Sequence, residues 1–261
     1  MKLLAIRVLS LLIGIENIPY LKLFVAKLFL SKTARKAINY DYLTGKIIKK
    51  ALESSSVCVD IGCHHGIILS MMIKHCSQGR FFAFEPLPIS YKYLVKQFDM
   101  PNVEIFNMAL SDTKGTAKFN YVVDDSAYSS LKEVQYLTSN KKIIEITVET
   151  DLLDNILDGK LDSNQKISFI KIDVEGAELQ VLVGSKNIIK KDKPIIIFEF
   201  GSATQEYYTT KPEDIYNLLC FECGLKISLL DSWLNNEKSL NEEEFKEQYY
   251  GGINYYFIAY P

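Results

Sequence analysis

The segment FIKIDVEGAELQVLVG (169–184) changes character halfway along. Its first half is apolar enough for a strand buried on both faces, and its second half repeats apolar residues at helical spacing. A strand that leads directly into a helix is the repeating unit of a parallel α/β sheet. Asp173, Glu175 and Glu178 surround the junction, and carboxylates are costly to place beside an apolar core. The segment therefore predicts both the fold class and a functional site.

The alternation of strand and helix repeats along the chain and predicts a doubly wound α/β fold with a mostly parallel sheet. Core strands are expected at 57–61, 80–85, 102–110, 166–173 and 194–200, with helices at 64–76, 88–98, 176–184 and 212–222. The polar stretch after the third strand contains two short strands, 116–122 and 143–149. Residues 226–230 and 253–260 are expected to end the chain as an antiparallel pair.

Length and charge limit the classes of function. The 261 residues, 48% of them hydrophobic, are sufficient for one enlarged domain. Residues 1–36 carry seven lysines or arginines and one acid, a net charge of +6, so the remainder of this −2 chain sums to −8. An acidic body does not favour nucleic acid as a partner. The five scattered cysteines fit reduced thiols in the cytoplasm.

The basic N-terminal region has two interpretations. Its longest apolar run, residues 8–15, is far too short to span a membrane. We expect residues 1–45 to form a helical extension and residues 46–261 to form the catalytic domain. The extension is either a cap packed on that domain or a segment that docks on an anionic membrane surface through residues 1–36.

The turn VDIGCHHG (59–66) follows the first predicted strand. Asp60 ends that strand, and Gly62 and Gly66 allow close backbone approach at the start of the next helix, a geometry suited to a nucleotide-sized cofactor. The G-x-x-x-G spacing differs from the dinucleotide fingerprint. Glu85 ends the second strand, 25 positions after Asp60, where an acid suits ribose hydroxyls. We expect His64 to shape the cofactor pocket; proton transfer is the alternative.

Five segments in this order, VDIGCHHG, FAFEP, NMALSDTKG, FIKIDVEGAEL and IIIFEF, resemble the FkbM family of S-adenosylmethionine-dependent methyltransferases, within the class I methyltransferase fold. The resemblance covers about residues 57–201 and implies a Rossmann-like, seven-stranded sheet with an antiparallel last strand. It also implies S-adenosyl-L-methionine as cofactor. The residues that it assigns to the cofactor are Asp60, Gly62 and Gly66 at the methionine moiety, Glu85 at the ribose, and Asn107, Met108 and Ala109 beside the adenine.

Three carboxylates are the predicted catalytic residues. Asp173 and Glu175 lie two positions apart in an extended segment, so both can face the crevice, and Glu199 ends the neighbouring strand. We expect Asp173 to act as the base or to orient the acceptor hydroxyl, and Glu175 and Glu199 to fix the acceptor. The same cluster could instead hold Mg²⁺ or Mn²⁺. Glu178 is expected to complement the positive end of its helix.

Taken with these residues, the resemblance implies an O-methyltransferase that acts on a hydroxyl of a sugar, glycoconjugate, glycolipid or small-molecule natural product. The alternatives are methylation of a nitrogen or carboxylate, and a non-catalytic cofactor-binding scaffold. The long unassigned region 120–142 is a candidate substrate lid. The acceptor's identity and the oligomeric state are not predicted.

Overall fold

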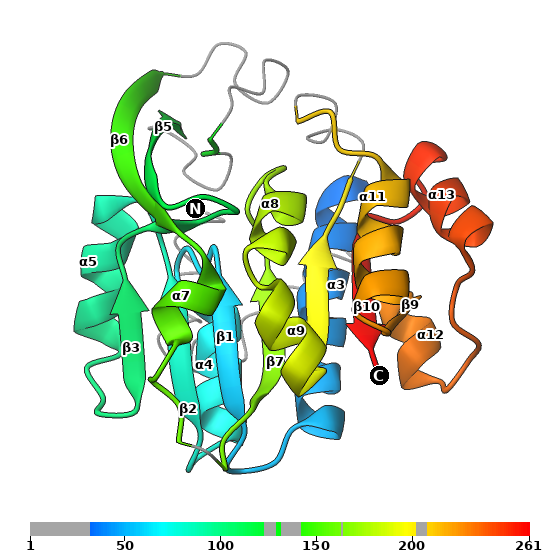
Figure 1. Ribbon diagram of the computed structural model, residues 1–261, viewed down its shortest axis with the longest axis horizontal. Coiled ribbons are helices and arrows are strands. Elements are labelled where there is room, and N and C mark those ends of the chain that lie inside the picture. Colours follow the sequence, from blue (N-terminus) through cyan, green and yellow to red (C-terminus); the bar gives the residue numbers. More distant parts are fainter. Residues whose placement is uncertain (1–31, 123–128, 132–141, 163, 202–207) are drawn as a thin grey trace.

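The computed structural model describes residues 32–122, 129–131, 142–162, 164–201 and 208–261, and its centre is a seven-stranded sheet (Figure 1). The strands lie in the order β3-β2-β1-β7-β8-β10-β9, and within this sheet β10 is antiparallel to both of its neighbours. The seven strands are β1 (Val57–Ile61), β2 (Arg80–Phe84), β3 (Val103–Phe106), β7 (Ile167–Ile172), β8 (Ile195–Glu199), β9 (Lys226–Ser228) and β10 (Tyr256–Tyr260). The predicted fold, with its antiparallel last strand, is confirmed.

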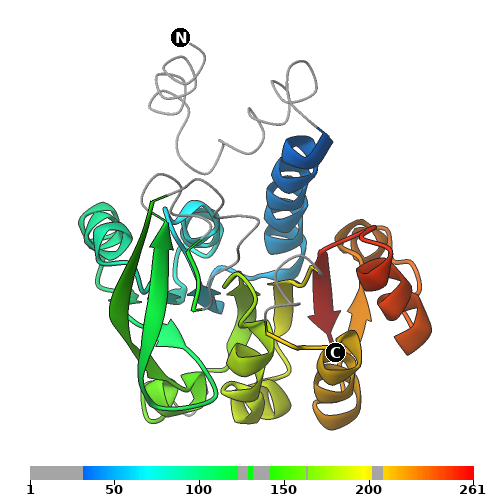
Figure 2. The same ribbon diagram turned by 90° about the horizontal axis from the view of Figure 1, so that it is seen from above.

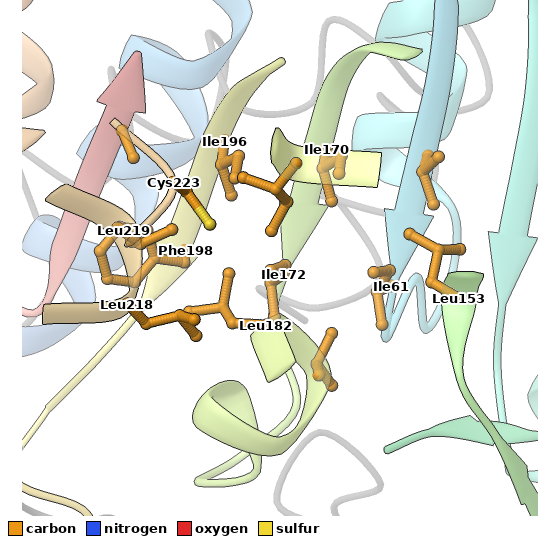
Figure 3. Packing of buried hydrophobic residues seen from close by; sticks show 14 of the residues in the cluster. Ile61, Leu153, Ile170, Ile172, Leu182, Ile196, Phe198, Leu218, Leu219 and Cys223 are labelled. Atoms are coloured by element: carbon orange, nitrogen blue, oxygen red, sulfur yellow. The ribbon is translucent and has the colours of Figure 1, made fainter. Parts of the chain in front are cut away.

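Helices cover both faces of the sheet because successive side chains of a strand project to opposite sides. On β1, Val57, Val59 and Ile61 join one apolar cluster, and Cys58 joins the cluster on the other face. The first cluster, part of which is seen in Figure 3, packs against α7 (Leu153–Leu157), α8 (Glu178–Val183), α9 (Lys186–Asp192), α11 (Pro212–Tyr216), the π-helix η3 (Asn217–Glu222) and α13 (Glu242–Tyr250). The second packs against α3 (Lys32–Ala51), α4 (Ile67–His75), α5 (Pro88–Gln97) and α12 (Leu230–Leu234).

A smaller, three-stranded sheet stands above the carboxyl ends of β1 to β3 (Figure 1). Its strands are β4 (Ala109–Leu110), β5 (Gly115–Val122) and β6 (Ile143–Asp151), in the order β4-β6-β5. The two short strands predicted near 116–122 and 143–149 are therefore confirmed. The single third strand expected over 102–110 is wrong, because the chain leaves the large sheet after Phe106, and Ala109 then pairs with Thr150.

The helix α3 ties the N-terminal region to the sheet. It runs unbroken through position 45, and Tyr40, Ile47 and Ile48 are buried in the apolar cluster that it shares with α4. Residues 1–31 lie outside the described part of the chain, so the division at 45/46 and the membrane role of residues 1–36 remain predictions. Among the described residues, no helix combines the length and the apolar character needed to cross a bilayer.

Candidate active site

A pocket lies at the carboxyl edge of the large sheet, between the strand ends and the small sheet; Figure 2 looks down on this edge. Eight of the predicted site residues line it: Gly62, His64, Glu85, Met108, Ala109, Asp173, Glu175 and Glu199. Among the described residues, three other predicted ones, Asp60, Gly66 and Asn107, are not part of the lining. These eight predicted residues come from five different strand ends, those of β1, β2, β3, β7 and β8.

The turn after β1 can be built only with glycine at its first position. Gly62 has a φ of 76°, and a Cβ there would lie 1.9 Å from the carbonyl oxygen of Asp173. Gly66 also has positive φ, and a Cβ at this position would lie 2.5 Å from the ring of Phe98. Gly62 thus brings the turn against the segment that follows β7, whereas Gly66 allows α4 to pack beside α5.

Glu85 ties this turn to the loop after β2. Its Oε2 accepts a hydrogen bond from the His64 backbone N–H at 2.8 Å, and its Oε1 accepts one from Leu87 N–H at 2.9 Å. Burial raises the pKa of Glu85 to about 7, although the two backbone donors favour the charged form. Each carboxylate oxygen has a second lone pair, so Glu85 can still accept hydrogen bonds from two ligand hydroxyls.

The residues after β3 hold their place through Asn107. Its side-chain amide donates hydrogen bonds to the carbonyl oxygens of Glu85 and Pro86, at 2.9 and 3.0 Å. This exposed amide therefore joins the ends of β2 and β3 behind the pocket, while Met108 and Ala109 form part of its wall. Asn107 is a structural tie between two strand ends, a role that the sequence pattern did not distinguish from ligand contact.

Asp60 is buried within β1, behind the pocket wall. Burial raises its pKa to about 7, the charge of Lys171 opposes that rise, and the charge of Asp173 adds to it. No described residue donates a hydrogen bond to its Oδ2 atom. A buried carboxylate with an unsatisfied oxygen is costly, which makes Asp60 sensitive to any change in the neighbouring charges.

Asp173, Glu175 and Glu199 meet at the end of the pocket formed by β7 and β8, away from Glu85 and Ala109. One carboxylate oxygen from each lies within 4.8 Å of the others. Asp173 directly follows β7 and Glu199 ends β8, so the parallel strands bring these two together. Glu175 reaches the cluster through a left-handed backbone conformation with a φ of 53°, rather than through the extended segment expected from the sequence.

Lys171 and Tyr256, which the sequence analysis missed, hold Asp173. The Lys171 ammonium lies 3.0 Å from Asp173 Oδ2, and the Tyr256 hydroxyl donates a hydrogen bond of 2.5 Å to the same oxygen. The Lys171 side chain is 3% exposed and that of Asp173 32% exposed, so the cation is hidden behind the carboxylate. Lys171 could have been recognised in the sequence as the charged residue within the apolar strand ISFIKI. No feature of the sequence indicated Tyr256.

The carboxylates of Asp173 and Glu199 differ in their tendency to ionise. Burial opposes ionisation of Asp173, but Lys171 and the hydrogen bonds from Glu199 and Tyr256 outweigh it, so its pKa lies below the usual value. Burial, together with the charges of Asp173 and Glu175, raises the pKa of Glu199 well above its usual value. The arrangement favours an ionised Asp173 that accepts a hydrogen bond from a protonated Glu199.

Tyr40 of α3 supports Tyr256 from behind. The two rings are stacked with centroids 4.8 Å apart, and the Tyr40 hydroxyl donates a 2.8 Å hydrogen bond to Asn254 Oδ1. The Tyr40 ring also meets Tyr255 edge-on at 4.9 Å. Helix α3 therefore braces the residue that contacts Asp173.

Glu178 and the candidate lid complete the surroundings of the pocket. The buried Glu178 carboxylate accepts hydrogen bonds from the backbone N–H groups of Val174 and Gly176, so it closes the turn that carries Glu175. Within the proposed lid, residues 123–128 and 132–141 lie outside the described part of the chain. The described segment 129–131 contributes Ser129 and Leu131 to the pocket wall.

Comparison with known proteins identifies the family. The methyltransferase FkbM domain matches residues 60–227. The methyltransferase sdnD of Sordaria araneosa is 29% identical over 159 residues, which cover 51% of this chain and 61% of that protein. The AMB antimetabolite synthetase AmbE of Pseudomonas aeruginosa is 25% identical over 164 residues, covering 51% of this chain but 8% of the synthetase.

A solved structure described as methyltransferase FkbM from Methylobacillus flagellatus is 15% identical, with a TM-score of 0.49; the match covers 95% of this chain and 60% of that one. The domain match alone spans well over half of this chain and contains the turn after β1 and all three clustered carboxylates. The chain therefore belongs to the methyltransferase FkbM domain family.

Proposed function

We propose that this protein transfers a methyl group from S-adenosylmethionine to a hydroxyl of a sugar, glycoconjugate, glycolipid or small-molecule natural product. The observation that carries the proposal is the carboxylate of Asp173, which faces the pocket and is kept ionised by the buried Lys171 behind it. Family membership supports methyl transfer, and the carboxylate cluster supports a hydroxyl acceptor, because such an acceptor needs a positioned base.

The pocket residues fit the proposed cofactor. Gly62 lines the pocket where its turn meets Asp173, and Glu85 offers two oxygens with spare lone pairs to the ribose hydroxyls. His64, Met108 and Ala109 complete the wall on this side, and Asp60, Gly66 and Asn107 support it from behind. When bound, S-adenosylmethionine supplies an electrophilic methyl group on a sulfonium.

The three carboxylates have different roles, proton acceptance and positioning of the acceptor. Asp173 would accept the proton of the acceptor hydroxyl, so that the hydroxyl oxygen can take up the methyl group that the donor supplies. Glu199, whose proton is donated to Asp173, and Glu175 both offer oxygens that accept hydrogen bonds, so the pair can orient an acceptor that carries several hydroxyls. The acceptor therefore lies at the end of the pocket formed by β7 and β8.

The direct experiment supplies labelled donor to the wild-type protein with extracts of the host's surface polysaccharides, glycolipids and small molecules. We expect wild type to label one fraction and Asp173→Asn to lower the rate by about 100-fold or more, the usual contribution of a general base. Labelling that survives this substitution would favour a nitrogen or carboxylate acceptor. Binding of S-adenosylhomocysteine without any labelling would favour a non-catalytic scaffold.

A divalent cation is the alternative use of the three carboxylates, because carboxylate oxygens are ligands that Mg²⁺ and Mn²⁺ prefer. Lys171 and Tyr256 already occupy Asp173 Oδ2, which favours hydroxyl activation without a metal. We therefore expect the labelling rate to be unchanged after dialysis against a chelator. A rate that falls and is restored by Mg²⁺ or Mn²⁺ would establish the metal role.

The basic segment 1–36 supports a second, separate proposal, which is docking of a cytoplasmic protein on an anionic membrane surface. Removal of residues 1–31 leaves α3 whole. We expect this truncation to abolish co-sedimentation with vesicles that contain phosphatidylglycerol and to leave the melting temperature unchanged. A lower melting temperature with no vesicle binding by the full chain would instead identify a packed cap.

A further inference from the structure

The pocket has two chemically different ends. Asp173, Glu175 and Glu199 form one end, at β7 and β8. The other end is an apolar wall made by Leu87, Ala109, Phe119 and Leu131, all of which line the pocket. Leu87, Ala109 and Phe119 belong to a small apolar cluster, separate from the two clusters of the large sheet, and Leu131 packs against it.

Positions along the sheet edge show which part of a nucleoside ligand faces the apolar wall. In a sheet of this kind the glycine turn follows the first strand and the ribose acid ends the second, so the base lies further out. Here Gly62 follows β1 and Glu85 follows β2, and the order β1-β2-β3 continues toward Ala109. The apolar wall is therefore next to the base end, and the carboxylates are on the side of the transferred group.

The small sheet supplies the outer half of the wall. Phe119 lies on β5, is 6% exposed and pairs with Ile146 of β6. Ser129 Oγ accepts a hydrogen bond of 3.0 Å from Val122 N–H, which attaches the segment that carries Leu131 to the end of the same strand. Phe119 is thus positioned by strand pairing and the segment of Leu131 by this hydrogen bond, as a preformed binding surface requires.

Leu87 connects this wall to the ribose acid. Its N–H donates to Glu85 Oε1, and its side chain belongs to the cluster of Phe119. A nucleoside whose ribose contacts Glu85 would therefore place its base within the reach of the apolar wall. Purine rings present apolar faces that stack well on aromatic side chains.

We propose that Phe119 of the small sheet and Leu131 of the segment 129–131 form the base subsite of the pocket, with Phe119 packed against the purine. This inference rests on the proposed function, because it assumes an adenosyl ligand. It gives the three-stranded sheet a role in ligand binding. It also accounts for the large aromatic side chain of β5 that faces the pocket.

The test measures binding without methyl transfer, by titration calorimetry of the full chain with S-adenosylhomocysteine and with 5′-methylthioadenosine, which lacks the amino-acid arm. We expect Phe119→Ala to weaken binding of both ligands by about tenfold or more, as expected for a lost aromatic–base contact. Phe119→Leu should weaken both by a smaller factor. The matched control is Val148→Ala, which alters a buried residue of the same cluster that is outside the pocket lining.

The outcomes distinguish a failure of the proposed function from a failure of the base subsite. Wild-type protein that binds neither ligand would overturn the proposed function together with the subsite. Wild-type binding that Phe119→Ala leaves unchanged would overturn the subsite alone. Equal losses in Phe119→Ala and Val148→Ala would show that the cluster acts only through folding, and a loss confined to S-adenosylhomocysteine would place Phe119 at the amino-acid arm.

Discussion

The Tyr256 hydroxyl donates a hydrogen bond to Asp173, a residue 83 positions earlier in the chain. The bond joins the antiparallel strand β10 to the turn after β7, and the stacked ring of Tyr40 fixes the donor. Position and protonation of the proposed base therefore depend on the last strand of the sheet and on α3. Family motifs around Asp173 do not contain this information.

Replacement of Tyr256 with phenylalanine removes this hydrogen bond and keeps the ring. We expect the free energy of unfolding to fall by about 1.5–3 kcal/mol, the range for a hydrogen bond to a charged group, as measured by urea denaturation. Tyr250→Phe is the control, because Tyr250 is 63% exposed, and it should change stability by less than about 0.5 kcal/mol. Equal effects of the two substitutions would show that the Tyr256 bond adds nothing.

Replacement of Lys171 with methionine keeps most of the side-chain volume and removes a buried charge. Asp60 and Asp173 would lose their nearest cation, so we expect a loss of about 3–5 kcal/mol at pH 7 in urea denaturation. The loss should shrink as the pH falls to 5, because the carboxyl groups can then take up protons. Adding Asp60→Asn should recover part of it. A loss independent of pH would instead indicate a packing defect.

Glu178 provides a test of pH-dependent stability. Burial raises its folded-state pKa to about 7, above the model-peptide value of about 4.5, so the folded protein binds the extra proton between these values and its stability falls as the pH rises through them. Glu178→Gln retains an acceptor oxygen for Val174 and Gly176. Relative to wild type, it should gain up to about 3 kcal/mol at pH 8 and nothing at pH 4. Destabilisation at both pH values would contradict this reasoning.

Alanine substitutions at Gly62 and Gly252 distinguish the cost of backbone strain from the cost of steric overlap. Both have positive φ, 76° and 59°, but a Cβ at Gly62 meets the Asp173 carbonyl, whereas no described atom lies within 4 Å of a Cβ at Gly252. We expect Gly252→Ala to cost about 1–2 kcal/mol and Gly62→Ala to cost more than about 4 kcal/mol in urea denaturation. Similar costs would mean that the turn moves away from Asp173 without difficulty.

Alternating side-chain direction explains why much of the site could be predicted. Asp173 follows β7 and Glu199 ends β8. Side chains of both strands alternate between the two apolar clusters of the large sheet, and the pairing of β7 with β8 brings these strand ends together. The Glu175 backbone turn and the Tyr256 contact could not be predicted, because one depends on a local left-handed conformation and the other on an 83-residue separation.

The error in the third strand has a similar cause. Residues 102–110 are apolar enough to form one strand, and periodicity does not reveal that Ala109 pairs in a second sheet. Helices such as α7 and α12, each five residues long, are too short for a periodic signal. The pairing of Ala109 and the positions of these short helices depend on contacts between distant segments, which local sequence patterns do not show.

The most direct test of the account is a crystal structure of the full chain with S-adenosylhomocysteine. We predict that the ribose hydroxyls contact Glu85, the base contacts Phe119, and the sulfur lies at the end of the pocket lined by Asp173, Glu175 and Glu199. A ligand bound with its sulfur away from these carboxylates, or a pocket without ligand at saturating concentration, would contradict the proposed arrangement of donor and acceptor.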